Sequence, residues 1–422
     1  MRSAIAGLAL LAAAAGALAQ DAAPVVKEIS FLGNEVTQPS TMLREMQLQV
    51  GDAADPAAIE RARQGVQDLG LFRSVQAQTE PVDGGVRLVI KVKEKLYILP
   101  LPRADASSDG GYGYGAELRW YNVWGLNHTF TPYFERRQPS EGDNDPEKRG
   151  LQTRTQLRYS APFVFGEFGM DAAAGYFKTP YLTPLEYDQT TTFLTLTLNR
   201  KLTEGDRSQG WLGRAGLSWA NEEHSGSQVP TDPADVARGQ ALAAVAGATY
   251  RDLRYNVYSD EGTTFGATVQ NAAEGVASDY DYTSWSLHYA RYTYVGETPH
   301  QNLNFLFNAQ ARHDGAYGGD SLAIGGTETV RGFEPETVKG DAFYAASAEY
   351  LRPVFRNSIR VLAVVDAGNA FVEPGDANLD KVYVSAGIGV RVRFQAFVAL
   401  DLEIGIAWPL NGGGPRLFAS KV

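Results

Sequence analysis

The sequence predicts a transmembrane antiparallel β-barrel of about 16 strands, preceded by one small α/β module. Beyond residue 95, apolar and polar residues alternate along stretches of roughly ten residues, the length of a membrane-spanning strand. Long and short connections alternate between these stretches, as in an up-and-down barrel. After the first 19 residues, no apolar run approaches the roughly 20 residues that a membrane helix needs. Strands are therefore the expected membrane-crossing elements.

The first 19 residues have the composition of a secretory signal peptide. Arg2 precedes an apolar run that starts at Ala4, and Ala17-Leu18-Ala19 resembles a small-residue cleavage site. The alternative is a helix of a soluble protein. It fits less well, because a charge followed by an unbroken apolar run is a poor amphipathic pattern. We therefore expect residues 1–19 to be removed and the chain to be exported.

Charge and cysteine content argue against several function classes. The chain has 38 Lys and Arg residues against 49 Asp and Glu residues, a formal net charge of -11. This balance argues against nucleic acid as a partner, since phosphate binding relies on clustered cations. An exported chain without Cys has no disulfide framework and no thiolate chemistry. A soluble exported protein and a transmembrane barrel remain.

Residues 25–94 are expected to form the small α/β module. A strand near Val26–Phe31 ends at Gly33-Asn34, where positive φ angles are tolerated. A helix then begins at an Asp55-Pro56 cap and ends at Gly70. Two strands, about 72–79 and 86–92, flank the turn Asp83-Gly84-Gly85. Such a module has a short sheet with an exposed edge, which either accepts a strand from another chain or binds nothing.

Residues 96–422 are expected to form the barrel. In the stretch 384–393, apolar residues occupy the even positions, while Arg391 and Arg393 share the other face with Ser385. In 398–407, Asp401 and Glu403 likewise oppose a leucine and isoleucine face. A soluble sandwich also alternates, so the aromatic residues near strand ends matter more, because a membrane barrel places them in interfacial girdles.

Alternation marks sixteen strands, and their connections favour the barrel over a Greek-key sandwich. The long connections include 138–149, 222–240 and 314–342, whereas the short ones read "NVWG", "APFV" and "RNS". The expected strands are 96–106, 112–122, 127–137, 150–160, 165–177, 188–200, 209–221, 241–252, 261–272, 281–295, 301–313, 343–354, 358–371, 381–394, 396–410 and 414–422.

The longest connection, 314–342, contains the motif "VRGF" at Val330, Arg331, Gly332 and Phe333. Loops of this length are usually functional or disordered, and this composition is not that of a disordered segment. The first module, with its "GN" and "GLF" segments, resembles a polypeptide-transport-associated (POTRA) domain. Together with "SAEYLRP" at 347–353 and "VVDAGNAF" at 364–371, these features resemble the BamA/TamA outer-membrane superfamily, which includes two-partner secretion transporters.

This resemblance implies that the loop folds back into the barrel lumen and that Arg331 pairs with Glu349 and Asp366. Glu349 shares a face with Ser347, whereas Asp366 shares its face with Leu362 and Val364, so the pattern leaves its inward placement open. A carboxylate facing lipid would cost a few kcal/mol, which favours the lumen for both.

In the same loop, Gly332 would permit a close backbone approach and Phe333 would anchor the tip by packing. The alternative is an exposed loop arginine.

Pro100 and Pro102 lie in the first expected barrel strand. Residues two apart direct their N–H groups to the same edge, so both prolines remove donors from one side. The second strand needs the well-bonded side, which places the deficient edge at the seam with the last strand. We expect a weak seam that opens laterally; the alternative is that residues 96–102 are merely linker.

No catalytic, metal or cofactor site is expected. "GGDSL" at 318–322 is similar to a hydrolase nucleophile segment with Ser321, but no His residue has a recognisable partner motif. No His or carboxylate cluster has metal-ligand spacing, and no Gly-rich loop joins a strand to a helix.

The resemblance implies a bacterial outer-membrane location with the POTRA domain in the periplasm. It also implies a factor that inserts client proteins into the outer membrane or transports them across it. Its expected partners are an extended client polypeptide, outer-membrane lipid or lipopolysaccharide, and an accessory periplasmic protein. The alternative is a passive pore or structural surface antigen on the same scaffold.

Overall fold

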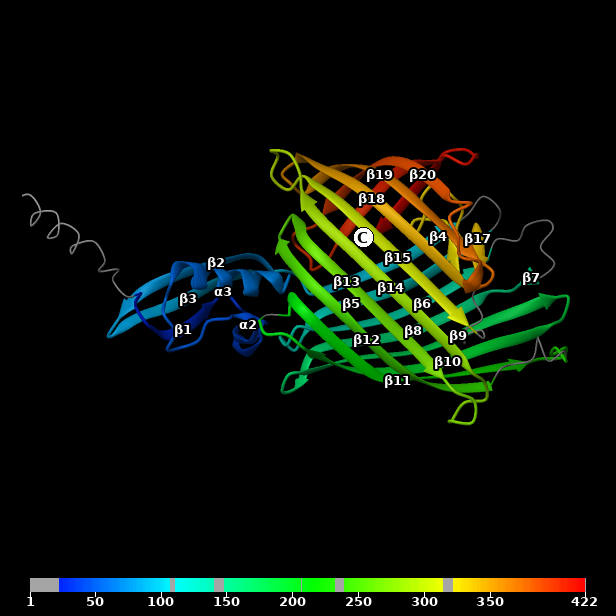
Figure 1. Cartoon of the computed structure of the whole chain (residues 1–422), viewed down its shortest axis with the longest axis horizontal. Helices are drawn as coiled ribbons and strands as arrows, with labels where there is room; N and C mark the ends of the chain where they lie inside the picture. Colours follow the sequence, from blue (N-terminus) through cyan, green and yellow to red (C-terminus); the bar gives the residue numbers. More distant parts are fainter. Residues whose placement is uncertain are drawn as a thin grey trace, which may run out of the picture.

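The computed structural model describes residues 23–106, 111–139, 148–205, 207–231, 239–313 and 322–421. The expected signal peptide 1–19, Ser321, and the first part of the expected loop, 314–321, lie outside the described residues. Figure 1 shows a small N-terminal module, drawn in blue, beside one end of a large barrel. No helix in the described ranges is long and apolar enough to cross a membrane.

The module contains β1 (Val26–Leu32), α2 (Pro39–Glu45), α3 (Pro56–Asp68), β2 (Phe72–Val82) and β3 (Gly85–Glu94). Its sheet has the order β1-β3-β2, in which β1 runs parallel and β2 antiparallel to β3. The Asp55 side chain accepts a hydrogen bond from the Ala58 N–H and so caps α3. Fully buried Val26, Met42, Val66, Phe72 and Leu88 form the core between helices and sheet.

The described part of the barrel contains 17 strands in one closed sheet. The short β7 and the longer β8 both pair with β9, so they share one position and leave sixteen positions around the barrel, 17 less one. The strands are β4 (Ile98–Ala106), β5 (Tyr112–Val123), β6 (His128–Gln138), β7 (Lys148–Arg149), β8 (Gln152–Phe165), β9 (Phe168–Thr183), β10 (Tyr187–Lys201), β11 (Gln209–Ser225), β12 (Gly239–Asn256), β13 (Ser259–Ala272), β14 (Tyr282–Tyr294), β15 (Asn302–His313), β18 (Ala342–Phe355), β19 (Ile359–Phe371), β20 (Tyr383–Arg393), β21 (Asp401–Pro409) and β22 (Arg416–Lys421).

Two expected strand boundaries are wrong. The segment 161–164, expected as the turn "APFV", belongs to β8, and the chain reverses instead at Gly166, whose φ of 55° suits a tight turn. The strand expected over 396–410 begins only at Asp401. Residues before it turn back to the start of the barrel, where Leu96 N–H donates to Ala396 O and Val398 packs into the core of the module.

Polar and apolar faces of the strands divide as a membrane barrel requires. Leu196, Ile388 and Ile404 are 47%, 58% and 63% exposed on the outer face. Arg391 and Glu403, on the opposite faces of β20 and β21, are buried. Ionic groups therefore line the lumen, while the aliphatic groups face outward, as in a barrel surrounded by a bilayer.

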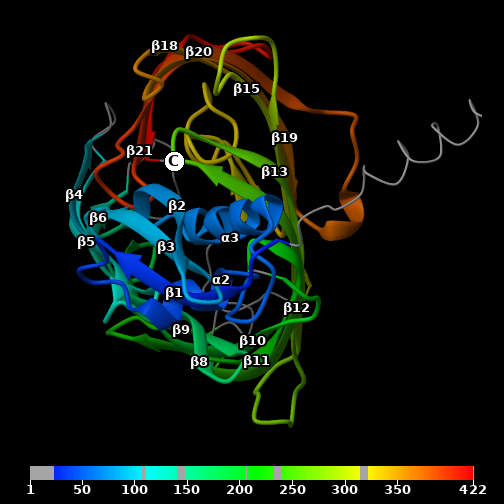
Figure 2. The same ribbon diagram turned by 90° about the vertical axis from the view of Figure 1, so that its left-hand side faces the viewer.

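The module lies across one mouth of the barrel, as the end view in Figure 2 shows. Asp68, at the end of α3, accepts hydrogen bonds from Tyr255 N–H at 2.8 Å and from Arg254 Nη1 at 2.9 Å. On the other side of the mouth, the Thr41 hydroxyl donates to Gly125 O in the β5–β6 turn at 2.8 Å. Burial raises the pKa of the Asp68 carboxyl, against the opposing effect of these donors.

Lys95 joins the module to the barrel at the same mouth. Its Nζ donates to Gly70 O at 2.9 Å and to the Tyr255 hydroxyl, and it lies 4.5 Å from the centre of the Tyr255 ring. Lys95 is 4% exposed. Burial lowers the pKa of its ammonium group to about 8.

This lowered pKa predicts that stability rises with alkaline pH. Below about pH 8 Lys95 is charged in both the folded and the unfolded chain; between about 8 and 10.5 only the unfolded chain keeps the proton. The folded state should therefore gain up to about 3 kcal/mol across that window. We expect the thermal unfolding midpoint of the purified protein in detergent to rise between pH 7 and pH 9.5, relative to Lys95→Met. Parallel pH curves for the two proteins would contradict this.

Candidate functional site

The "VRGF" segment lies in a loop inside the barrel, between the short strands β16 (Leu322–Ile324) and β17 (Val338–Gly340). Val330 is fully buried in a cluster with Ile324 and Ala370, and Phe333 packs edge-on against Tyr383 with ring centroids 5.4 Å apart. Apolar contacts on both sides of the motif thus hold the loop to the wall formed by β18 to β20.

Gly332 adopts a φ of 92°, and a Cβ at this position would lie 3.3 Å from Ala407 of β21. A larger residue would therefore be strained in its backbone and crowded against the wall. This close approach lets the neighbouring Arg331 reach carboxylates on three different strands.

Arg331 makes the central contacts of the site. Its Nε and Nη2 donate to the two oxygens of Asp366 at 2.8 and 2.9 Å, and its backbone N–H donates to Asp366 Oδ2 at 3.0 Å. Nη2 also donates to Glu349 Oε1 at 3.1 Å and to Ser347 Oγ at 2.8 Å. Nη1 donates to Glu403 Oε1 at 2.7 Å. The structure thus brings Arg331, Glu349 and Asp366 together and adds Glu403.

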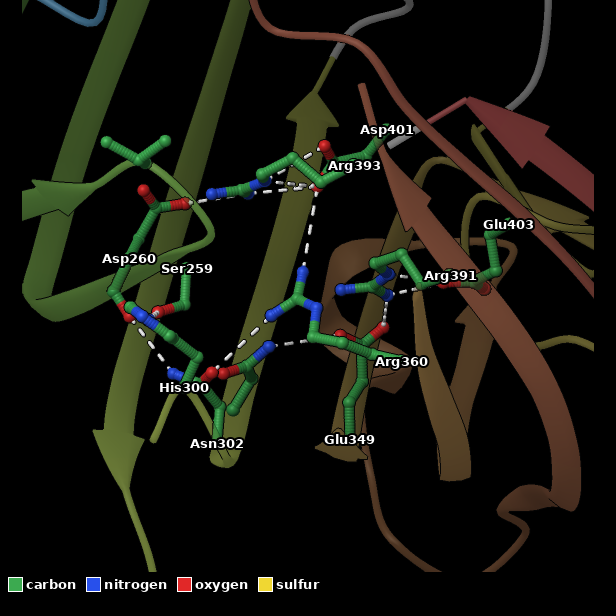
Figure 3. Close-up of polar contacts among 12 residues, drawn as sticks. Ser259, Asp260, His300, Asn302, Glu349, Arg360, Arg391, Arg393, Asp401 and Glu403 are labelled. Atoms are coloured by element: carbon green, nitrogen blue, oxygen red, sulfur yellow. Dashed lines mark hydrogen bonds and ion pairs between the residues drawn. The ribbon is translucent and has the colours of Figure 1, made fainter. Parts of the chain in front are cut away.

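A second arginine completes the site. Arg391 Nη2 donates to Glu349 Oε1 at 2.8 Å, and its Nε donates to Glu403 Oε2 at 2.8 Å, with a further short contact between Nη2 and that carboxylate. Figure 3 shows Arg391 between the two glutamates. All of these groups are buried, so each charge depends on its partners rather than on water.

A neighbouring network extends toward the module. Arg393 Nε donates to Asp401 Oδ1 at 2.9 Å and its Nη2 to Asp260 Oδ2 at 3.2 Å. Arg360 lies between Asn302 Oδ1, at 3.4 Å from Nη1, and Asp401 Oδ2, at 3.9 Å from Nη2 (Figure 3). Ionic contacts thus continue along this wall from the loop to the mouth that the module covers.

Sequence reasoning left Asp366 open and missed Glu403 and Arg391. Asp366 does face the lumen, because Leu362 and Val364 on the same face pack inward beneath the loop. Glu403 and Arg391 lie directly opposite each other on β21 and β20. Alternation had already placed both on the polar face of neighbouring expected strands, so a search for opposite charges across that pair could have found them.

Pro100 and Pro102 lie in β4, which pairs with β5 from Ile98 to Ala106, so 98–102 is not a free linker. Tyr97 O accepts from Tyr121 N–H on the β5 side, whereas Leu96 N–H donates to Ala396 O on the opposite side. Successive residues alternate in direction, so both prolines face away from β5, toward β22. Within the described residues, β22 and β4 are neighbours in the closed sheet.

Among the described residues, no group of three or more His, Asp or Glu side chains could hold a metal ion. Ser321, the candidate nucleophile considered above, lies outside the described residues. The site consists of paired charges that join the loop to the barrel wall.

Comparisons with known proteins match both parts of the chain. Residues 103–392 match the family described as haemolysin secretion/activation protein ShlB/FhaC/HecB, and residues 24–95 match the POTRA family described as surface antigen variable number repeat. Residues of this chain are 36% identical over 70 positions to the outer membrane protein assembly factor BamA of Nitratidesulfovibrio vulgaris, a match that spans 17% of this chain and 9% of that protein.

Solved structures share the fold. CdiB from Escherichia coli superposes with a TM-score of 0.61 at 14% identity, covering 94% of this chain and 75% of that one. CdiB from Acinetobacter baumannii gives 0.58 at 15%, covering 92% and 70%. BamA from Haemophilus ducreyi lacking POTRA domains 1–3 gives 0.53 at 17%, covering 94% and 85%.

Removing Arg331 is expected to destabilise the barrel. In Arg331→Met, Asp366 loses the three hydrogen bonds that Arg331 donates to it, while Glu349 and Glu403 keep Arg391. Loss of one partner of a buried pair costs about 3–5 kcal/mol. Arg331→Lys keeps the charge without the fork of donors and should lose less. The measurement is the urea midpoint of the folded band on unheated gels.

The matched control is Arg200→Met, since Arg200 is exposed and pairs with exposed Glu167. Equal midpoints for Arg331→Met and this control would show that the loop arginine does not brace the barrel.

Proposed function

The chain belongs to the haemolysin secretion/activation protein family ShlB/FhaC/HecB, and on that premise we propose that it passes client polypeptides across, or inserts them into, the bacterial outer membrane. Its relatives are outer-membrane transporters and assembly factors rather than enzymes. We therefore assign it no catalytic residues. The sequence-based resemblance to the BamA/TamA superfamily is confirmed, as are the barrel with its POTRA domain and the outer-membrane location.

The observation that carries the proposal is the place of the POTRA sheet at the mouth of the barrel (Figure 2). The sheet order leaves β1 and β2 as edge strands. Edge strands present unpaired N–H and C=O groups, to which an extended client adds as a further strand. Because Asp68 and Lys95 hold the module against the mouth, a client on that sheet is delivered to the lumen.

The outward aliphatic face of the barrel contacts lipid and lipopolysaccharide, and the module in the periplasm is open to an accessory protein that hands over the client. The loop held by Arg331, Glu349 and Asp366 keeps the barrel in one arrangement between transport events. A client that enters the lumen meets this loop.

The junction of β22 with β4 is the second route we propose. Pro100 and Pro102 supply no N–H groups to that edge, so it holds fewer hydrogen bonds than a strand pair of the same length. A junction with fewer bonds opens at lower cost than its neighbours, which would let a client strand pair there or leave sideways.

Depleting the protein from its host tests the function. We expect specific secreted or outer-membrane proteins to fall several-fold in abundance, and plasmid-borne wild-type protein to restore them. The measurement is quantitative proteomics of the medium and the outer membrane. Unchanged levels of all envelope and secreted proteins would instead favour a passive pore or structural surface antigen.

The double variant Pro100→Val with Pro102→Thr tests whether the junction of β22 with β4 opens. These changes restore two donors, which should tighten the junction, raise thermal stability and slow client handling several-fold in restored cells. The control is Pro162→Thr in β8, a strand proline separated from β4 by β5 and β6 in the order of the sheet. Client handling at the wild-type rate in the double variant would rule out lateral opening.

A further inference from the structure

The lumen is charged unequally on its two sides. On the side described above, the arginines of the loop, β19 and β20 are paired with carboxylates from β13, β18, β19 and β21. Between this side and the strands β4 to β8 lies a cavity of about 1150 Å³, which Arg331, Glu349 and Glu403 also line. Five arginines from the strands β4 to β8 line this cavity, namely Arg103, Arg119, Arg137, Arg154 and Arg158. We call these five the arginine wall.

Among the described residues, β4 to β8 contribute fewer acidic groups than arginines to the cavity lining, and these acidic groups are largely covered. Glu117 and Glu135 are the carboxylates that β4 to β8 contribute to the cavity lining. The Glu117 side chain is 10% exposed beneath Arg103 and Arg119, whose side chains are 46% and 29% exposed. Glu135 is 9% exposed and lies opposite Arg154 in the register of β6 and β8. The groups that reach the open cavity are therefore mostly guanidinium groups.

The spacing of the arginine wall follows the strand repeat. Arg154 and Arg158 lie on the same face of β8, four residues and thus roughly 13 Å apart. Tyr133 and Phe177 line the cavity beside them. Side chains on one face of an extended polypeptide repeat every two residues, or roughly 7 Å. Carboxylates four residues apart on such a polypeptide therefore match the spacing of Arg154 and Arg158.

Cationic side chains continue from the cavity toward the module. Arg214 on β11 and Arg251 on β12 interact electrostatically with each other and with His288 on β14. Arg207, in the turn before β11, donates to Asn199 and binds the module, since its backbone N–H donates to Glu45. Asp171 lies within electrostatic reach of both Arg251 and Arg207, and Glu45 within reach of Arg207. The excess of cations thus extends along the lumen from the mouth to the cavity.

The loop itself offers carboxylates to this wall. Glu328, three residues before Arg331, lines the same cavity, and Glu336 lies within electrostatic reach of Arg137. The resting protein therefore already places acidic side chains of an irregular segment against the arginine wall. A client with acidic side chains would compete with the loop for the same groups.

From these observations we propose that the arginine wall binds an acidic, extended segment of the client polypeptide as it passes through the lumen. This rests on the proposed transport function and specifies which clients the barrel accepts. Lipopolysaccharide is not the favoured ligand, because the wall faces the lumen rather than the lipid. A guanidinium fork suits carboxylates in pairs, and binding through it weakens as salt screens the charges.

The test uses fluorescence anisotropy with the purified full-length protein in uncharged detergent. Labelled peptides of alternating Glu and Thr, Gln and Thr, or Lys and Thr are compared at low salt and at ~0.5 M salt. We expect only the Glu peptide to bind, and to lose binding at high salt. Arg154→Gln with Arg158→Gln should weaken it about tenfold, whereas Arg154→Lys with Arg158→Lys should retain most of it.

The matched control replaces two exposed arginines on the outer face, Arg200→Gln with Arg291→Gln. Equal weakening by the control, or equal binding of the Glu and Gln peptides to the wild type, would overturn the proposal. Heparin, a sulfated polysaccharide, serves as a second anionic probe. Binding of heparin without binding of the Glu peptide would also overturn the proposal. The gel mobility of unheated samples verifies that each variant is folded.

Client abundance in cells separates this proposal from the function on which it rests. If depletion lowers client levels but Arg154→Gln with Arg158→Gln restores them fully, the arginine wall is not a client site and the transport function stands. If depletion changes no protein, the transport function itself fails.

Discussion

Arg331 carries a charge from a loop into the interior of the barrel, where its side chain is 8% exposed. A charge in that position must be paired, because desolvating a guanidinium without partners costs more than the fold can supply. Its partners come from β18, β19 and β21, so one side chain connects three strands of the sheet to the loop. Arg391 then shares two of these carboxylates and ties in β20. The path of the loop, the register of these strands and the shape of the lumen all follow from this one requirement.

The two sides of the lumen differ in how their charged side chains are paired and exposed. Near the loop, arginines and carboxylates satisfy one another and hold the wall rigid. On the arginine wall, Arg103 and Arg119 pair with Glu117 and yet remain 46% and 29% exposed to the cavity. The first arrangement joins the loop to the wall, and the second is the one that we propose binds a client. Since the POTRA domain is held at the mouth by Asp68 and Lys95, both sides open onto the space that a bound client would enter.

Much of the fold could be predicted because β-strands alternate with a period of two residues, a local property of the chain. Alternation placed Arg391 and Glu403 on one kind of face and their aliphatic neighbours on the other. It could not resolve Asp366, since Leu362 and Val364 share its face and pack inward beneath a loop that only the folded barrel supplies. Alternation could not predict that the strand starts at Asp401 either. The residues before Asp401 form hydrogen bonds with Leu96, which is far away in sequence.

The sequence by itself determined the class of fold, the order of the POTRA elements, the inward or outward face of most strand residues and the two prolines without donors. Each of these follows from covalent structure or from neighbours within a few residues. The tertiary structure alone decided that Arg331 meets Glu403 as well as Glu349 and Asp366, and that five arginines line one cavity. These depend on strand register and on closure of the sheet, which bring together residues that no local pattern relates.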